Sequence, residues 1–210
     1  MKYFSLIFII LLFSCEKKED VLLPKSNVTI VKDVQDHSPI YIFFKIEGKD
    51  TIADVNRKNS IISTNWLFNI DKRLPLKLVI PEVIKLQEKK RADSAHKNEN
   101  AENYFSYADS IGKNLAFLPF TKVYYKMGKS TRKDEIVIQF KKQSNTVFLD
   151  NAEIKKAEIL NCIHRMDYNV LPKIILLFDQ NMKYEEYIQN KILIHKLNIF
   201  NGEIPEEFIF

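Results

Sequence analysis

The sequence predicts an α+β protein in which a mixed sheet carries helices packed on one face. Three observations lead to this class. Apolar and polar residues alternate at 136–140, a run at 173–178 is apolar on both faces as in a central strand, and apolar residues recur with helical spacing at 184–192. A hairpin, a helix, a strand and a second helix in this order are typical of a sheet covered on one side.

The first half of the chain begins with a hairpin. Residues 40–46 predict a strand, Glu47-Gly48-Lys49-Asp50 supplies turn chemistry, and residues 51–55 return as the partner strand. Residues 66–70 predict a further strand, so a sheet is expected in this half as well.

A helix is expected after that strand, because apolar residues from Leu76 to Leu86 keep helical spacing. Pro75 suits a helix start, whereas Pro81 predicts either a kink or a later start. The polar stretch 89–102 predicts a linker or a solvated helix end. A second short helix is expected after this stretch, with one face formed by Tyr104, Tyr107, Ala108 and Ile111.

The second half has a clearer pattern. Residues 136–140 and 146–149 predict a hairpin around a Ser144-Asn145 turn. A helix is expected next, with Asp150 or Asn151 as its cap. Its inward residues would be Ile154, Ala157, Leu160, Ile163 and Met166.

A repeat links the two halves. The segment Leu67-Phe68-Asn69-Ile70-Asp71-Lys72-Arg73-Leu74-Pro75-Leu76 aligns with Ile175-Leu176-Leu177-Phe178-Asp179-Gln180-Asn181-Met182-Lys183-Tyr184. In both, a buried strand ends at an aspartate and a helix begins a few residues later. The two halves, 27–116 and 117–210, are therefore expected to contain related strand-turn-helix units.

These units resemble the periplasmic domain of ExbD/TolR-type proteins, in which a strand ending in Asp-Lys leads through a short turn into a helix. Asp71-Lys72 with Pro75 carries the resemblance in the first half, and Asp179 with Tyr184 in the second, where Gln180 replaces the lysine. The resemblance covers 136–200 well and 40–95 loosely. It implies a domain that pairs with itself and binds extended peptide or cell-wall partners.

The chain also departs from that family. ExbD/TolR-type proteins are anchored by a transmembrane helix that bears a proton-carrying aspartate. Residues 3–14 are shorter than the roughly 20 apolar residues that span a bilayer, and they contain no acid. Proton-driven motor function is therefore not expected here.

The amino terminus instead resembles a bacterial lipoprotein signal. Phe4–Phe13 has the length of a signal-peptide core, and Leu12-Phe13-Ser14-Cys15 resembles a lipobox, with Cys15 as the lipidated residue. The sequence predicts a signal peptide at 1–14, a lipidated polar tether at 15–26 and an α+β domain at 27–210. The acyl chains would attach the protein to the membrane.

The location follows from the same region. Lys18-Glu19-Asp20 resembles the export signal of Bacteroidota surface lipoproteins. We therefore expect an outer-membrane lipoprotein of the cell envelope, with surface display favoured over the periplasmic side.

Composition limits the partners. Lysines and acids are mixed along the chain and the formal net charge is only +5, so nucleic acid is not an expected partner. With Cys15 acylated, Cys162 is the only thiol, and an intrachain disulfide is excluded.

Enzyme motifs are missing. The sequence has no G-x-S-x-G, H-E-x-x-H, P-loop or G-x-G-x-x-G pattern, so no catalytic residue, metal ligand or cofactor is assigned. Cys162 and His164 would point apart on a helix and cannot share one ion; a core role is favoured for Cys162.

Three residues are candidates for a site: Asp71, Asp179 and Tyr184. Aspartates at the ends of sheet strands can belong to a site, but an aspartate just before a helix is more often a cap, and we favour capping. A second set could line a ligand groove, although a core role is simpler: Tyr104, Phe105, Tyr107, Tyr124 and Tyr125.

The sequence therefore predicts a lipid-anchored envelope protein that acts as a non-enzymatic binding or scaffold module. The alternative is an envelope hydrolase or a carbohydrate-active accessory lipoprotein. A binding module would use an open strand edge left by the hairpins at 136–149 and 40–55, with Ile136, Ile138 and Phe140 as an apolar strip beside it. The edge would serve either to form a homodimer or to bind an envelope protein or peptide.

Overall fold

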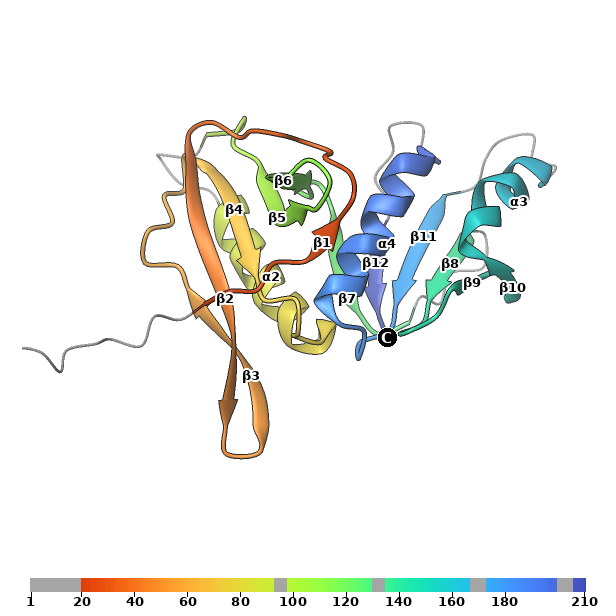
Figure 1. Cartoon of the computed structure of the whole chain (residues 1–210), viewed down its shortest axis with the longest axis horizontal. Coiled ribbons are helices and arrows are strands. Elements are labelled where there is room, and N and C mark those ends of the chain that lie inside the picture. The colour runs from red at the N-terminus through yellow and green to blue at the C-terminus, as the bar shows by residue number, and fades with distance from the viewer. Residues whose placement is uncertain (1–19, 93–97, 130–134, 167–172, 200–205) are drawn as a thin grey trace, which may run out of the picture.

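A computed structural model describes residues 20–92, 98–129, 135–166, 173–199 and 206–210 (Figure 1). Its strands form two six-stranded mixed sheets, so the predicted α+β class is confirmed, with two sheets in place of one. The helices are α2 (Leu76–Arg91), the short α3 (Ile159–Arg165), preceded by the 3-10 turn η2 (Lys156–Glu158), and α4 (Tyr184–Leu197).

The first sheet, sheet A, belongs to the amino-terminal half. Its strands are β1 (Lys25–Ser26), β2 (His37–Glu47), β3 (Asp50–Asn56), β4 (Asn65–Ile70), β5 (Asn103–Asp109) and β6 (Asn114–Pro119). β2, β4 and β5 are parallel neighbours, and β3 and β6 run antiparallel at the two sides. β5 pairs with β4 through its first residues and with β1 through its last.

The second sheet, sheet C, belongs to the carboxyl-terminal half. Its strands are β7 (Tyr124–Met127), β8 (Ile136–Phe140), β9 (Thr146–Leu149), β10 (Ala152–Lys155), β11 (Ile174–Phe178) and β12 (Glu206–Ile209), in the order β10-β9-β8-β11-β12-β7. β11 is buried throughout and lies between β8 and β12, so the predicted central strand is confirmed. The chain passes from sheet A to sheet C between Pro119 and Tyr124.

The two sheets contain the same arrangement. In sheet A a hairpin (β2-β3) is followed by a parallel strand (β4), a helix (α2) and a second parallel strand (β5); in sheet C the order is β8-β9, β11, α4 and β12. The predicted repeat is therefore present. The second half differs by an insertion, β10 with α3, between the hairpin and the parallel strand.

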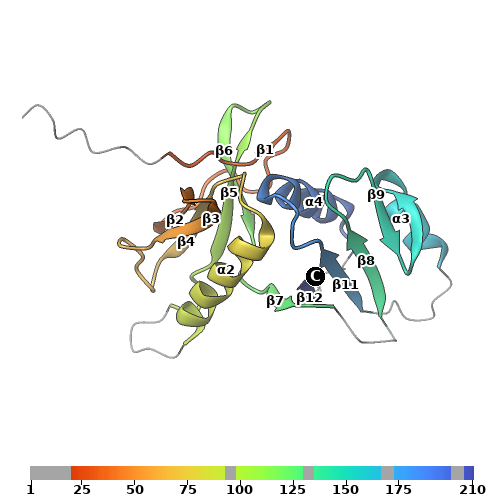
Figure 2. The ribbon, with the colours of Figure 1, turned by 90° about the horizontal axis from the view of Figure 1, so that it is seen from below.

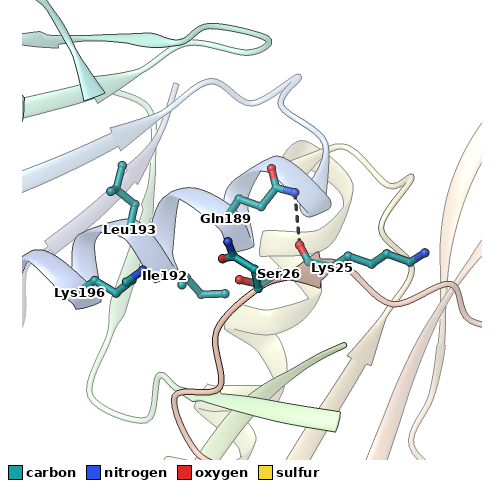
Figure 3. Close-up of a pocket in the computed structure, with 7 residues that line it drawn as sticks. Lys25, Ser26, Gln189, Ile192, Leu193 and Lys196 are labelled. Atoms are coloured by element: carbon teal, nitrogen blue, oxygen red, sulfur yellow. Dashed lines mark hydrogen bonds between the residues drawn. The ribbon is translucent and has the colours of Figure 1, made fainter. Parts of the chain in front are cut away.

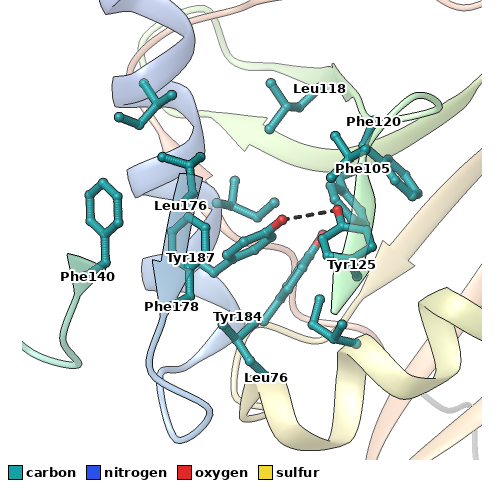
Figure 4. Packing of buried hydrophobic residues seen from close by; sticks show 14 of the residues in the cluster. Leu76, Phe105, Leu118, Phe120, Tyr125, Phe140, Leu176, Phe178, Tyr184 and Tyr187 are labelled. Carbon is teal, nitrogen blue, oxygen red and sulfur yellow. Dashed lines mark hydrogen bonds between the residues drawn. The ribbon is translucent and has the colours of Figure 1, made fainter. Parts of the chain in front are cut away.

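One core joins the halves. α2 packs on one face of sheet A, and α3 and α4 lie on one face of sheet C (Figure 2). Aromatic rings connect the sheets: Phe105 of β5 packs edge-on against Tyr187 of α4 at 6.2 Å between centroids, and Tyr187 packs edge-on against Phe178 of β11 at 4.9 Å. All three side chains belong to a single buried cluster (Figure 4).

The residues at the ends of α4 and α2 explain where these helices begin and end. α4 has Glu185 and Glu186 in its first turn and His195 and Lys196 in its last, which suits the helix dipole. It ends where Asn198 takes a left-handed conformation at φ 47°. In α2, the helix starts after Pro75 and continues through Pro81, so the later start at Pro81 does not occur.

One predicted helix is wrong, and another begins later than predicted. Residues 103–109 form strand β5, in which Asn103, Phe105 and Tyr107 alternate into the interior and the two aromatic residues favour a strand. Residues 152–155 form strand β10: Asp150 and Asn151 take positive φ angles of 47° and 71°, which makes them a tight hairpin turn and not a helix cap. α3 begins only at Ile159.

The predicted tether is too long. The described chain begins at Asp20, and residues 22–26 are hydrogen-bonded along β4 and β5 of sheet A, where Lys25–Ser26 form β1. Residues 31–36 then cross the face of sheet A opposite α2, where Val34 packs on Leu67 and Phe117. The folded domain therefore begins before residue 27.

Candidate functional site

The two predicted aspartates lie in equivalent turns. Asp71 follows β4 and Asp179 follows β11, and each carboxylate accepts a hydrogen bond from the backbone amide two residues later, Arg73 at 3.0 Å and Asn181 at 2.8 Å. Neither side chain caps its helix, because the residues at the cap positions are Pro75 and Lys183. The predicted capping role is therefore wrong.

The two turns meet and cap each other's helices through backbone carbonyls. Pro75 and Lys183 form an antiparallel bridge. The amide of Leu76 donates to the Met182 carbonyl at 2.9 Å, and the amide of Tyr184 donates to the Leu74 carbonyl at 2.8 Å.

The next residues repeat this exchange. The amide of Lys77 donates to the Gln180 carbonyl at 2.9 Å, and that of Glu185 to the Lys72 carbonyl at 3.2 Å. The pattern is symmetric about the bridge. It satisfies the amides of the first turns, which otherwise need side-chain caps. We call this contact between the turns 71–77 and 179–185 the turn junction.

Asp71 and Asp179 differ in their surroundings. Asp71 is fully buried and accepts two bonds from the Arg73 guanidinium, both at 2.8 Å, and one from the Leu22 amide at 3.2 Å. Burial raises the pKa of the Asp71 carboxyl, but the hydrogen bonds from Arg73 and the backbone amides outweigh it and hold that pKa below its ordinary value. The carboxylate thus holds the amino-terminal segment in place.

Tyr184, the third predicted residue, lies in the core beneath the turn junction. Its hydroxyl is buried and has no hydrogen-bond partner within the described part of the chain. Its neighbour Tyr187 belongs to a polar network instead: the Tyr187 hydroxyl donates to Glu207 at 2.8 Å and lies 3.1 Å from the Tyr125 hydroxyl (Figure 4). Glu207 also pairs with Lys191.

This polar network joins three elements of the carboxyl-terminal half, since Tyr125 comes from β7, Tyr187 and Lys191 from α4, and Glu207 from β12. Burial raises the pKa of the Tyr125 and Tyr187 hydroxyls well above the ordinary value, so both stay protonated. Each charge in the network has a partner, and the arrangement suits packing specificity better than proton transfer.

Two shallow surface pockets lie beside α4. The first, about 370 Å³, lies between residues 25–27 and the helix, and the Gln189 side-chain amide donates to the Lys25 carbonyl at 3.3 Å (Figure 3). The second, about 300 Å³, lies at the start of the helix and is lined by Lys142, Gln143, Asn181, Lys183, Glu185, Glu186 and Gln189. Both are open to solvent, and neither is lined by Asp71 or Tyr184.

Metal ligands do not gather in the described ranges: no group of three or more histidines, cysteines, aspartates and glutamates there could hold an ion. Cys162 of α3 packs against the core, whereas His164 faces solvent, as expected from their spacing. Burial and Lys191 lower the pKa of His195. Cys15, Lys18 and Glu19 lie outside the described residues, and Asp20 is exposed at their edge.

Sequence reasoning missed Lys191 and Glu207. One signal was present for Lys191, which stands four residues after Tyr187 on the apolar face of α4. A lysine at such a position needs a buried acid, but nothing local identified Glu207 as that acid. Of the aromatic set, Phe105, Tyr107 and Tyr125 are in the core, whereas Tyr124 is 59% exposed.

Comparison of the chain with protein-family models, with curated proteins and with solved structures gave no match. Among the described helices, none combines the length and the apolar character that crossing a membrane requires.

Proposed function

We propose that this chain is a lipid-anchored protein of the bacterial cell envelope whose folded part is a binding module without catalytic activity. The lipobox-like Leu12-Phe13-Ser14-Cys15 supports the anchor. The contacts of the buried acids support a role in binding and not in catalysis. Asp71 binds Arg73 and Leu22, and Glu207 binds Lys191 and Tyr187, so these buried acids are occupied by structural contacts.

One observation carries the proposal: the β2-β3 hairpin projects beyond sheet A as an arm (Figure 1). β2 pairs with β4 only through residues 37–42, whereas its pairing with β3 continues to Glu47. β3 is seven residues long, and β2 is its only neighbour among the described strands. Ile46, near the tip, is 67% exposed.

The register of the arm shows which backbone groups point outward. Gly48, at φ 62°, opens a two-residue turn, so Glu47 and Asp50 form a hydrogen-bonded pair. In an antiparallel ladder such pairs alternate. Residues 51, 53 and 55 of β3 therefore direct their amides and carbonyls away from β2.

The outward groups of β3 suit strand addition, in which an extended segment of a partner adds to the sheet through main-chain hydrogen bonds. Of the two hairpins expected to leave an edge, the one at 136–149 does not offer it beside Ile136, Ile138 and Phe140, because β8 lies between β9 and β11 and these side chains are buried. The other hairpin, at 40–55, contains β3. β3 takes its place in the proposal.

The test uses a photo-crosslinking residue at position 46 in the full chain in living cells. Thr51→Pro removes an outward amide at the edge, where proline is tolerated, and Thr51→Val keeps it. Crosslinks to an envelope protein or to a second copy should be lost in Thr51→Pro and kept in Thr51→Val. Identical crosslinks in both variants, or none in the parent, would remove the support for a binding role.

A further inference from the structure

Residues 22–26 occupy the position of a strand in sheet A. The Lys72 amide donates to the Leu22 carbonyl at 2.8 Å, the Ala108 amide to the Pro24 carbonyl at 2.9 Å, and the Ser110 amide to the Ser26 carbonyl at 2.8 Å. The Leu22 amide donates to the Asp71 carboxylate. The backbone carbonyls of alternate residues in this segment, Leu22, Pro24 and Ser26, are thus directed toward sheet A.

In the second half of the chain, the equivalent position is occupied by the end of β12. There the amide of Gln180, equivalent to Lys72, donates to the carbonyl of Phe210 at 2.8 Å, at the end of β12. β12 buries Glu207, Phe208 and Ile209. The equivalent segment in the first half is not the continuation of β5 but a separate piece of chain.

This segment is attached mainly through its main chain. Leu22 is 46% exposed and Lys25 is exposed, whereas Pro24 is buried. On its other side, the Lys25 carbonyl accepts from the Gln189 side chain, and the Lys25 side chain points away from α4 (Figure 3). Sheet A therefore recognises an extended backbone and one proline, and not a set of large side chains.

We propose that this position, formed by Asp71, Lys72, Ala108 and Ser110, is a binding site for an extended peptide. In this structure the chain's own residues 22–26 close it. The ligand is an extended segment of a partner polypeptide that contains a proline. Asp71 accepts the backbone amide of the residue two positions before that proline, and the proline, which has no amide to satisfy, takes the buried position of Pro24.

Physical reasons favour this ligand class. Asp71 is an ionised acceptor, so it binds an amide more strongly than a neutral acceptor would. The Lys72, Ala108 and Ser110 amides supply donors at the spacing of an extended chain. This site is separate from the edge of β3, so failure of one proposal leaves the other standing.

The test uses the full chain with Pro24→Asp, which places a charge in the buried position and weakens the chain's own strand. The probe is a fluorescent peptide of residues 20–27, Asp-Val-Leu-Leu-Pro-Lys-Ser-Asn. We expect it to bind this variant at least about tenfold more tightly than the parent, because the competing strand is weakened.

Two methylated peptides distinguish backbone recognition from apolar adsorption. Methylation of the Leu22 amide removes the donor to Asp71 and should weaken binding about tenfold, the expected size for a hydrogen bond to a charged group. Methylation of the Leu23 amide, which points away from the sheet, should leave binding unchanged. Equal affinity of the two peptides, or no binding to a folded Pro24→Asp chain, overturns the proposal.

A second measurement needs no variant. In the parent chain, hydrogen exchange at the Lys72, Ala108 and Ser110 amides should be faster than at Gln180, because the segment that covers them opens locally. If these amides exchange only with global unfolding, the site does not open and the proposal is wrong.

Discussion

Tyr184 and Tyr187 stand three residues apart on α4 and are both fully buried, but their hydroxyls differ. That of Tyr187 contacts Glu207 and Tyr125, whereas that of Tyr184 has no partner in the described part of the chain. A buried hydroxyl contributes to stability only when it is hydrogen-bonded. The pair therefore separates the effect of the ring from that of the hydroxyl.

We expect Tyr187→Phe to lower the free energy of unfolding by about 1–3 kcal/mol, because Glu207 and Tyr125 lose a partner inside the core. Tyr184→Phe should be neutral or slightly stabilising. Urea unfolding of both variants measures the difference. A larger loss in Tyr184→Phe than in Tyr187→Phe would contradict the hydrogen-bond assignment.

Glu206 links three strands of sheet C. It lies on β12, and its carboxylate pairs with Lys126 of β7 at 2.5 Å and with Lys173, next to β11, at 2.6 Å. The hydrogen bonds from Lys126 and Lys173 lower the pKa of Glu206 to about 2. The carboxylate therefore stabilises the fold at pH values above its ordinary pKa near 4.5.

This contribution should disappear as the pH falls from about 4.5 to about 2, because the carboxylate is protonated in the folded state as well. Glu206→Gln should cost about 1–2 kcal/mol at neutral pH and almost nothing near pH 2. Unfolding free energies across this range measure it, with Glu158→Gln at an exposed position as the control. A difference independent of pH would contradict the assignment.

Among the elements, the two turns of the turn junction have similar backbones, but their aspartates contribute differently to stability. The backbone of each turn caps the other's helix, so neither aspartate is needed for capping. Asp71 additionally holds Arg73 and Leu22, whereas the described bond of Asp179 is the local one to Asn181.

Asp71→Ala should therefore lower the free energy of unfolding by about 2–3 kcal/mol, since it leaves the Leu22 amide and part of the Arg73 guanidinium without their acceptor. Asp179→Ala removes one local turn bond and should cost about 0.5–1 kcal/mol. Chemical denaturation of the two variants compares them directly. Equal losses would show that Asp71 does not anchor the amino-terminal segment.

At the scale of the whole molecule, the proposed anchor and the fold are close together in the chain. Only six residues separate Cys15 from Leu22, which is bonded to Asp71. Because an extended residue spans at most about 3.6 Å, a lipid on Cys15 would hold the domain within roughly 25 Å of the membrane surface.

Cys15→Ala should abolish labelling by a fatty-acid analogue and move the chain from the membrane fraction to the soluble fraction. Cys162→Ala, which changes the chain's other cysteine, should leave both unchanged. Undiminished labelling of Cys15→Ala would contradict the lipoprotein proposal.

Local pattern alone determined several elements. The alternation in β8, the apolar run of β11, the turn at Gly48 and the helical spacing of α2 and α4 are each encoded within a few neighbouring residues. The repeat of Asp71 and Asp179 was visible for the same reason, since both aspartates end a buried strand.

The remaining features depend on contacts between residues that are distant in the chain, which no local pattern contains. Segment 103–109 fits a helix or a strand until β4 and β6 pair with it, and residues 22–26 appear as a polar linker until Asp71 and Ser110 bind their backbone. Lys191 and Glu207 become a pair only when β12 packs beneath α4. Local sequence sets propensities, whereas burial and hydrogen-bond pairing across the chain select among them.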